Sequence, residues 1–92
     1  MRIRWTEPAA HDLTQICDYI ERQNSTAVAR RVALSIFDQI GMLGKFPEMG
    51  RPGRKPGTRE LVISRLPYLA IYRVHAESVE ILRILHGAQD WG

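Results

Sequence analysis

Residues 59–86, RELVISRLPYLAIYRVHAESVEILRILH, decide the fold of this chain. The segment contains three apolar stretches, rich in β-branched and aromatic side chains, which are typical of β-strands. The first strand is expected over residues 60–65, and Pro67 then marks a turn. Residues 68–74 and 79–86 are predicted to form a hairpin. Because these strands carry apolar side chains on both faces, we expect much of the sheet to be covered on both sides.

Two helices are predicted upstream of the strands. Thr6 and Ser25 are suitable N-cap residues, the first helix should run to about Gln23, and Gly44 should end the second. The connection at Asn24 is short, so the two helices should form an antiparallel hairpin. Apolar residues recur every three or four positions in both helices: Ala9, Leu13, Ile16, Cys17 and Ile20, then Val28, Val32, Ile36, Ile40 and Leu43.

A helix pair followed by a run of strands indicates an α+β fold. Residues 2–6 alternate polar and apolar side chains and predict one further short strand before the helices. Residues 46–58 are rich in Pro and Gly and are expected to form a loop throughout. The order is therefore β-α-α-β-β-β, with the helical hairpin on a mainly antiparallel sheet. We expect residues 1–92 to form a single domain.

Composition narrows the classes of protein to which the chain can belong. No apolar run approaches the roughly 20 residues of a membrane span, and the first ten residues lack the apolar segment of a signal peptide, so we expect a cytoplasmic protein with no membrane partner. Cys17 is the sole cysteine and lies among apolar helix positions, which favours an inert thiol over a nucleophile. The histidines are isolated, and neither a metal site nor a cofactor is predicted.

The basic residues are mostly arginine, 11 of the 13, and the formal net charge is +3. Arg51, Arg54, Lys55 and Arg59 form a cluster without an intervening acidic residue. The rigid guanidinium fork suits carboxylate and phosphate groups, so this cluster is a candidate surface for nucleic acid or for an acidic protein. A solvated loop without a ligand is the alternative interpretation.

Four segments in sequence order resemble the RelE/ParE superfamily of bacterial toxins. No single segment is specific, but their order along nearly the whole chain is. They follow an Ala-x-x-Asp-Leu segment at residues 9–13, and they are F-P-x-x-G-R at 46–51, P-G-x-R-E-L-V at 56–62, P-Y-x-x-x-Y-R-V at 67–74 and V-E-I-L-R-I-L-H-G-A at 79–88. The resemblance implies the toxin of a type II toxin–antitoxin system, which inhibits growth until a cognate antitoxin neutralises it by direct binding.

The superfamily has two chemistries. RelE-like members cut mRNA on the ribosome, whereas ParE-like members poison DNA gyrase and are not nucleases. Ribonuclease members place basic or polar groups at positions that here hold Glu60, Val62, Leu69 and Gln89. An apolar side chain cannot stabilise a phosphorane, and a carboxylate would repel it. The resemblance therefore favours the ParE-like branch, in which no catalytic residue is expected.

The ribonuclease alternative has its own candidate residues. Arg65, Arg73, Arg83 and His86 lie on neighbouring predicted strands and would have to converge. A lone histidine at a strand end is more often structural. Arg83 shares a face with apolar residues, so it should be a buried side chain paired with Glu60 or Glu80, or else part of a site.

For the gyrase alternative, the candidate target-binding residues are Arg51, Arg54, Lys55, Arg59, Arg65 and Trp91. The antitoxin is expected to be acidic or mixed in charge, and to use an extended segment or an amphipathic helix. A third possibility is a non-toxic module that only binds an antitoxin.

Overall fold

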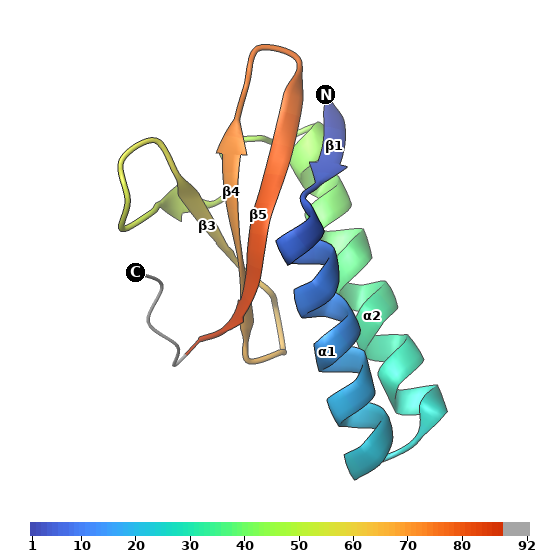
Figure 1. Cartoon of the computed structure of the whole chain (residues 1–92). Helices are drawn as coiled ribbons and strands as arrows, with labels where there is room; N and C mark the ends of the chain where they lie inside the picture. Colours follow the sequence, from blue (N-terminus) through green and yellow to red (C-terminus); the bar gives the residue numbers. More distant parts are fainter. Residues whose placement is uncertain (88–92) are drawn as a thin grey trace.

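The computed structural model describes residues 1–87 (Figure 1). The predicted order of helices and strands is confirmed, with one additional short strand. The elements are β1 (Arg2–Trp5), α1 (Glu7–Gln23), α2 (Thr26–Gly41), the 3₁₀ helix η1 (Met42–Gly44), β2 (Arg51–Pro52), β3 (Arg59–Val62), β4 (Tyr68–Val74) and β5 (Ser78–His86).

Both predicted helix caps are present. The Thr6 hydroxyl accepts a hydrogen bond from the Ala9 amide at 3.2 Å, and the Ser25 hydroxyl accepts one from Val28 at 3.2 Å. The second helix changes to 3₁₀ geometry after Gly41 and ends at Gly44, as predicted. Within residues 1–87, neither helix is long and apolar enough to cross a membrane.

Within residues 1–87, five strands form one mixed sheet in the order β1-β5-β4-β3-β2. β1 runs parallel to β5, and all other neighbours are antiparallel. Two local predictions were wrong. The expected loop contains β2, because Arg51 pairs with Glu60 of β3. The expected strand also stops at Val62, because the chain turns at Arg65, which has a left-handed φ of 67°.

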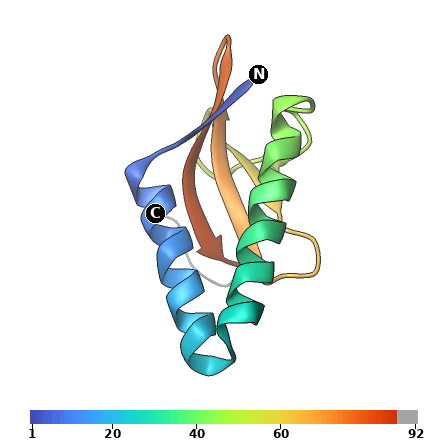
Figure 2. The same ribbon diagram turned by 90° about the vertical axis from the view of Figure 1, so that its right-hand side faces the viewer.

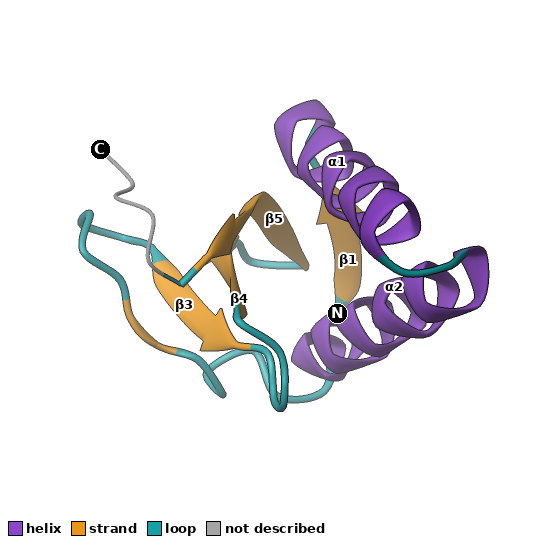
Figure 3. Cartoon of the chain, turned by 90° about the horizontal axis from the view of Figure 1, so that it is seen from below, coloured by secondary structure: helices purple, strands orange, loops and turns teal. Residues whose placement is uncertain are grey.

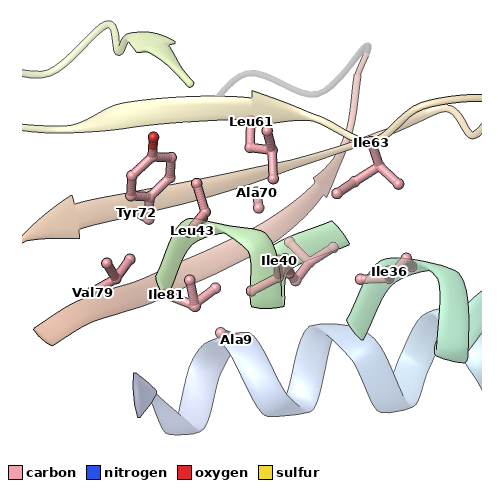
Figure 4. Close-up of a cluster of buried hydrophobic side chains, with 11 residues drawn as sticks. Ala9, Ile36, Ile40, Leu43, Leu61, Ile63, Ala70, Tyr72, Val79 and Ile81 are labelled. Atoms are coloured by element: carbon pink, nitrogen blue, oxygen red, sulfur yellow. The ribbon is translucent and has the colours of Figure 1, made fainter. Parts of the chain in front are cut away.

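The helical hairpin covers one face of the sheet (Figures 2 and 3). The core between the two layers contains Tyr72, which is completely buried (Figure 4). Each fully buried Ile or Leu stabilises such a core by roughly 1.5–3 kcal/mol. The buried core residues are Ala9, Ile36, Ile40, Leu43, Leu61, Ile63, Ala70, Tyr72, Val79, Ile81 and Ile84.

The opposite face of the sheet carries a smaller apolar cluster. Leu69, Ile71 and Leu85 are buried there, with Leu82 packed against them. The register between β4 and β5 shifts beside Ile71, as in a β-bulge, which inserts an extra residue on one strand. Apolar side chains are therefore buried on both faces, as predicted.

Candidate functional site

A groove lies between α1 and the second half of β5. β1 pairs with β5 only from Ser78 to Ile81, and α1 lies beside the strand edge beyond that point. Thr6 connects β1 to α1 and holds both against β5. Its amide donates to the Ile81 carbonyl at 3.1 Å, and its hydroxyl donates to the Leu82 carbonyl at 3.1 Å. The end of one strand and the start of one helix thus position the groove.

Asp12 joins the two walls of the groove. Its Oδ2 accepts hydrogen bonds from Arg83 Nε at 2.7 Å and from the Ile84 amide at 2.9 Å, while Oδ1 accepts one from Arg83 Nη2 at 3.0 Å. This carboxylate raises the pKa of Arg83, which stays charged. The predicted pairing of Arg83 with Glu60 or Glu80 was wrong, because folding brings α1, and not those strand residues, to the edge of β5.

The far end of the groove is aromatic and polar. The whole groove has a volume of about 450 Å³, and Tyr19, Tyr68 and His86 are among its lining residues. The rings of Tyr68 and His86 meet edge to face, with their centroids 5.9 Å apart. Burial, and then the neighbouring Tyr19 and Cys17, raise the pKa of Tyr68, so its hydroxyl stays protonated at neutral pH. The groove therefore offers hydrogen-bond donors and apolar surface together.

The four residues that a nuclease would need do not all meet here. Arg83 and His86 line the groove, but Arg65 and Arg73 do not. Arg65 lies in the turn after β3, and Arg73 lies at the opposite end of β4, where it pairs in register with Glu80. The predicted convergence is therefore wrong for Arg73 and is not seen for Arg65.

The basic cluster surrounds one buried carboxylate. Glu60 is only 4% exposed, and its Oε1 accepts a hydrogen bond from Arg51 Nη2 at 3.1 Å. Its Oε2 accepts one from the Arg54 amide at 3.2 Å, with the Arg54 guanidinium at 4.0 Å. Glu60 offsets part of the positive charge, and it holds these two arginines at the end of the sheet with their side chains more than half exposed.

Arg59 and Tyr72 hold the segment before β2. Arg59 donates to the carbonyls of Glu48 at 3.0 Å and Gly50 at 3.1 Å. The Tyr72 hydroxyl accepts from the Gly50 amide at 2.9 Å and donates to the Pro47 carbonyl at 2.8 Å. Arg59 therefore anchors this segment. A target-binding arginine would instead extend its guanidinium into solvent, which Arg59 does not do.

The sequence profile of one family matches residues 3–91, nearly the whole chain. That family is described as the ParE toxin of the type II toxin–antitoxin system parDE. The chain belongs to the ParE toxin family.

Relatives of known sequence or structure are likewise toxins or chains of toxin–antitoxin systems. A putative toxin, Y4kP of Sinorhizobium fredii, is 44% identical over 98% of this chain and 92% of its own length. Toxin RelE2 of Caulobacter vibrioides is 40% identical over 96% of this chain and 97% of its own length. A chain from the chromosomal ParDE toxin–antitoxin system of P. aeruginosa has a TM-score of 0.87 and 33% identity, covering 94% of this chain and 95% of that one. The predicted RelE/ParE-like fold is therefore confirmed.

Three of the four positions at which ribonuclease members were expected to differ from this chain lie within residues 1–87: Glu60, Val62 and Leu69. Leu69 is buried in the apolar cluster opposite the helices, and Glu60 is engaged by Arg51 and Arg54. Val62 is 55% exposed and apolar. Gln89 and Trp91 lie outside the described residues, so the structure does not place the Trp91 candidate. Nor do residues 1–87 contain a group of three or more His, Cys, Asp or Glu side chains that could hold a metal.

Sequence reasoning missed two residues that shape these surfaces. Asp12 occurs three residues after Ala9 and four before Ile16, inside the apolar stripe of α1. A carboxylate in such a stripe needs a buried partner, and that signal was available. Tyr72 lies within the predicted strand over residues 68–74. The sequence carried no signal that its hydroxyl would hold Pro47 and Gly50.

Proposed function

We propose that this ParE-family toxin poisons DNA gyrase and that a cognate antitoxin neutralises it by direct binding. One observation supports this choice over RNA cleavage: two of the basic residues that a nuclease would need, Arg83 and Arg73, lie apart along the sheet. Arg83 is paired with Asp12, and Arg73 lies at the other end of β4. RNA cleavage needs a base, an acid and phosphate-binding cations around one phosphodiester. A poison that stabilises an enzyme–DNA complex needs only a binding surface.

The proposed gyrase-binding surface comprises Arg51, Arg54 and Lys55. Arg65, the further candidate, lies in the turn after β3, at the opposite end of that strand from this cluster. Arg51 and Arg54 have side chains 59% and 51% exposed. Partial neutralisation by Glu60 leaves a net positive end, which suits phosphates or acidic protein segments. Arg59 contributes indirectly, by holding Glu48 and Gly50 in place.

The antitoxin is proposed to use the groove between α1 and β5. Among residues 1–87, β5 has no strand partner on its α1 side beyond Ile81, and Arg83 in that groove is 38% exposed. An extended or helical segment with a carboxylate facing Arg83 would suit both features. The relative from P. aeruginosa belongs to a ParDE system, which supports a protein partner for this chain as well.

The test is a cleavage assay with purified toxin, gyrase and supercoiled plasmid, run beside a ribosome and mRNA reaction. The proposal expects linear DNA with covalently bound protein, which the antitoxin prevents, and intact mRNA. Ribosome-dependent mRNA cleavage without linear DNA would overturn it. That second outcome is the RelE-like alternative, and the 40% identity to Toxin RelE2 makes the parallel reaction necessary.

A further inference from the structure

The segment 46–50, called here the anchored loop, combines a fixed backbone with exposed apolar side chains. Tyr72 and Arg59 hold it through the backbone groups of Pro47, Glu48 and Gly50. The Met49 amide also donates to the Phe46 carbonyl at 3.0 Å. Yet Phe46 is 53% exposed and Met49 is 47% exposed. The anchored loop therefore presents two exposed apolar side chains from a backbone that hydrogen bonds hold in place.

The apolar surface continues beyond the anchored loop. The Phe46 amide donates to the Met42 carbonyl at 2.9 Å, and Met42 is 46% exposed. The amino group of Met1 donates to the Gly44 carbonyl at 2.8 Å, and Met1 is 51% exposed. Met1, Met42 and Met49 are all the methionines of the chain. Methionine is flexible and polarizable, and it is common on surfaces that adapt to a protein partner.

The charges around this surface are mainly positive. Lys45 and Arg51 are exposed on either side of the anchored loop, and the N-terminal ammonium lies at Gly44. Glu48 is the single acidic residue between Met42 and Arg51. A second copy of the chain would bring like charges together. The surface instead complements a segment that has an apolar side chain flanked by carboxylates.

The anchored loop is also separate from the groove proposed for the antitoxin. Tyr72 faces Ile81, near the start of β5, whereas His86 ends that strand. The groove begins at Arg83, two residues from Ile81, but it lies on the α1 side of β5, whereas the anchored loop leads into β2 at the other edge of the sheet. The anchored loop therefore lies next to Arg51 of the proposed gyrase-binding surface and apart from the groove proposed for the antitoxin.

We propose that Phe46 and Met49 of the anchored loop, with Met42 beside them, contact an acidic segment of the target protein. The inference rests on the proposed function, in which that protein is gyrase. A rigid apolar pair is effective in this role because little conformational entropy is lost when it binds.

The test compares the double variant F46A/M49A with the wild-type chain and with L34A. Leu34 is 54% exposed on α2 and serves as a matched control. The dose needed for growth arrest on induction, and the concentration needed to trap gyrase on plasmid, should each rise at least about tenfold for F46A/M49A. L34A should match the wild type. All three proteins should retain the melting temperature and co-purify with the antitoxin encoded beside the toxin gene.

Two charge variants test the stated chemistry without altering the apolar pair. K45E should raise the effective dose and E48K should lower it, with both effects weaker at high salt. Full toxicity of F46A/M49A would overturn the inference. Loss of antitoxin binding by that variant would also overturn it, because the surface would then belong to the antitoxin.

The gyrase proposal can fail separately. Wild-type protein that arrests growth without trapping gyrase would contradict the gyrase target, while the dose comparison would still decide whether the anchored loop contacts the target. Wild-type protein that arrests nothing would overturn both proposals.

Discussion

Asp12 supplies the hydrogen-bond acceptor that the edge of β5 lacks once β1 has ended. It pairs with Arg83 and also accepts the Ile84 amide, although it lies on a helix. D12A would leave a partly buried guanidinium and a buried amide without this partner, so we expect a loss of about 3 kcal/mol in the free energy of unfolding. D12N keeps an acceptor oxygen and should lose about half as much.

Urea unfolding measures both losses. D18A changes an exposed aspartate of the same helix and should stay within about 0.5 kcal/mol of the wild type. An equal effect of D12A and D18A would contradict the role assigned to Asp12.

The Tyr72 hydroxyl is predicted to stabilise the fold through Gly50 and Pro47. Y72F removes one acceptor and one donor from a buried site, and we expect a loss of about 1–3 kcal/mol. Y68F is the matched control, since Tyr68 is only partly buried and its described contact with His86 is through the ring. Similar stabilities for the two variants, measured by thermal unfolding, would rule out the proposed restraint.

Cys17 should react slowly with alkylating reagents. Burial raises the pKa of its thiol, and the carboxylates of Asp18 and Glu21 raise it further. Because the thiolate is the reactive form, a raised pKa means a smaller reactive fraction at any pH below it. At pH 8, the folded protein should therefore react with iodoacetamide more slowly than the unfolded chain. The increase of the reaction rate with pH should also occur at higher pH in the folded protein. Equal pH profiles for folded and unfolded protein would refute this.

At the scale of the elements, the N-caps of the two helices differ in one testable way. Ser25 caps α2 alone, whereas Thr6 caps α1 and also donates its hydroxyl to Leu82 of β5. S25A should cost about 1 kcal/mol, which is typical of a lost cap. T6A should cost more, about 2 kcal/mol, because it also removes a contact with the sheet. Chemical denaturation of the two variants compares them directly.

The helices were predictable because their caps and apolar stripes are local signals. The end of β3 was not, since residues 60–65 have a strand-like pattern but Arg65 adopts a left-handed turn. β2 was also missed, because Pro52 and its neighbours have a loop composition and only pairing with Glu60 and Arg59 makes two of them a strand. Local patterns do not contain that long-range pairing.

For the whole molecule, the ordered segments from Phe46 to Ala88 were sufficient to predict the family and the layered fold. The candidate sites were less predictable. The partner of Arg83 is Asp12, 71 residues away in the sequence. The short β1, which pairs with β5, leads directly into the helix that carries Asp12. Nothing in the spacing of the basic residues shows that Glu60 engages Arg51 and Arg54, or that loop carbonyls engage Arg59.

The central claim is that this toxin acts through gyrase and not by cutting RNA. The most direct test is to induce the toxin in cells without its antitoxin and to analyse plasmid DNA and mRNA from the same sample. We predict protein-linked linear plasmid, intact mRNA, and loss of both the damage and the growth arrest when the antitoxin is restored. Cleaved mRNA with intact, supercoiled plasmid would contradict the claim.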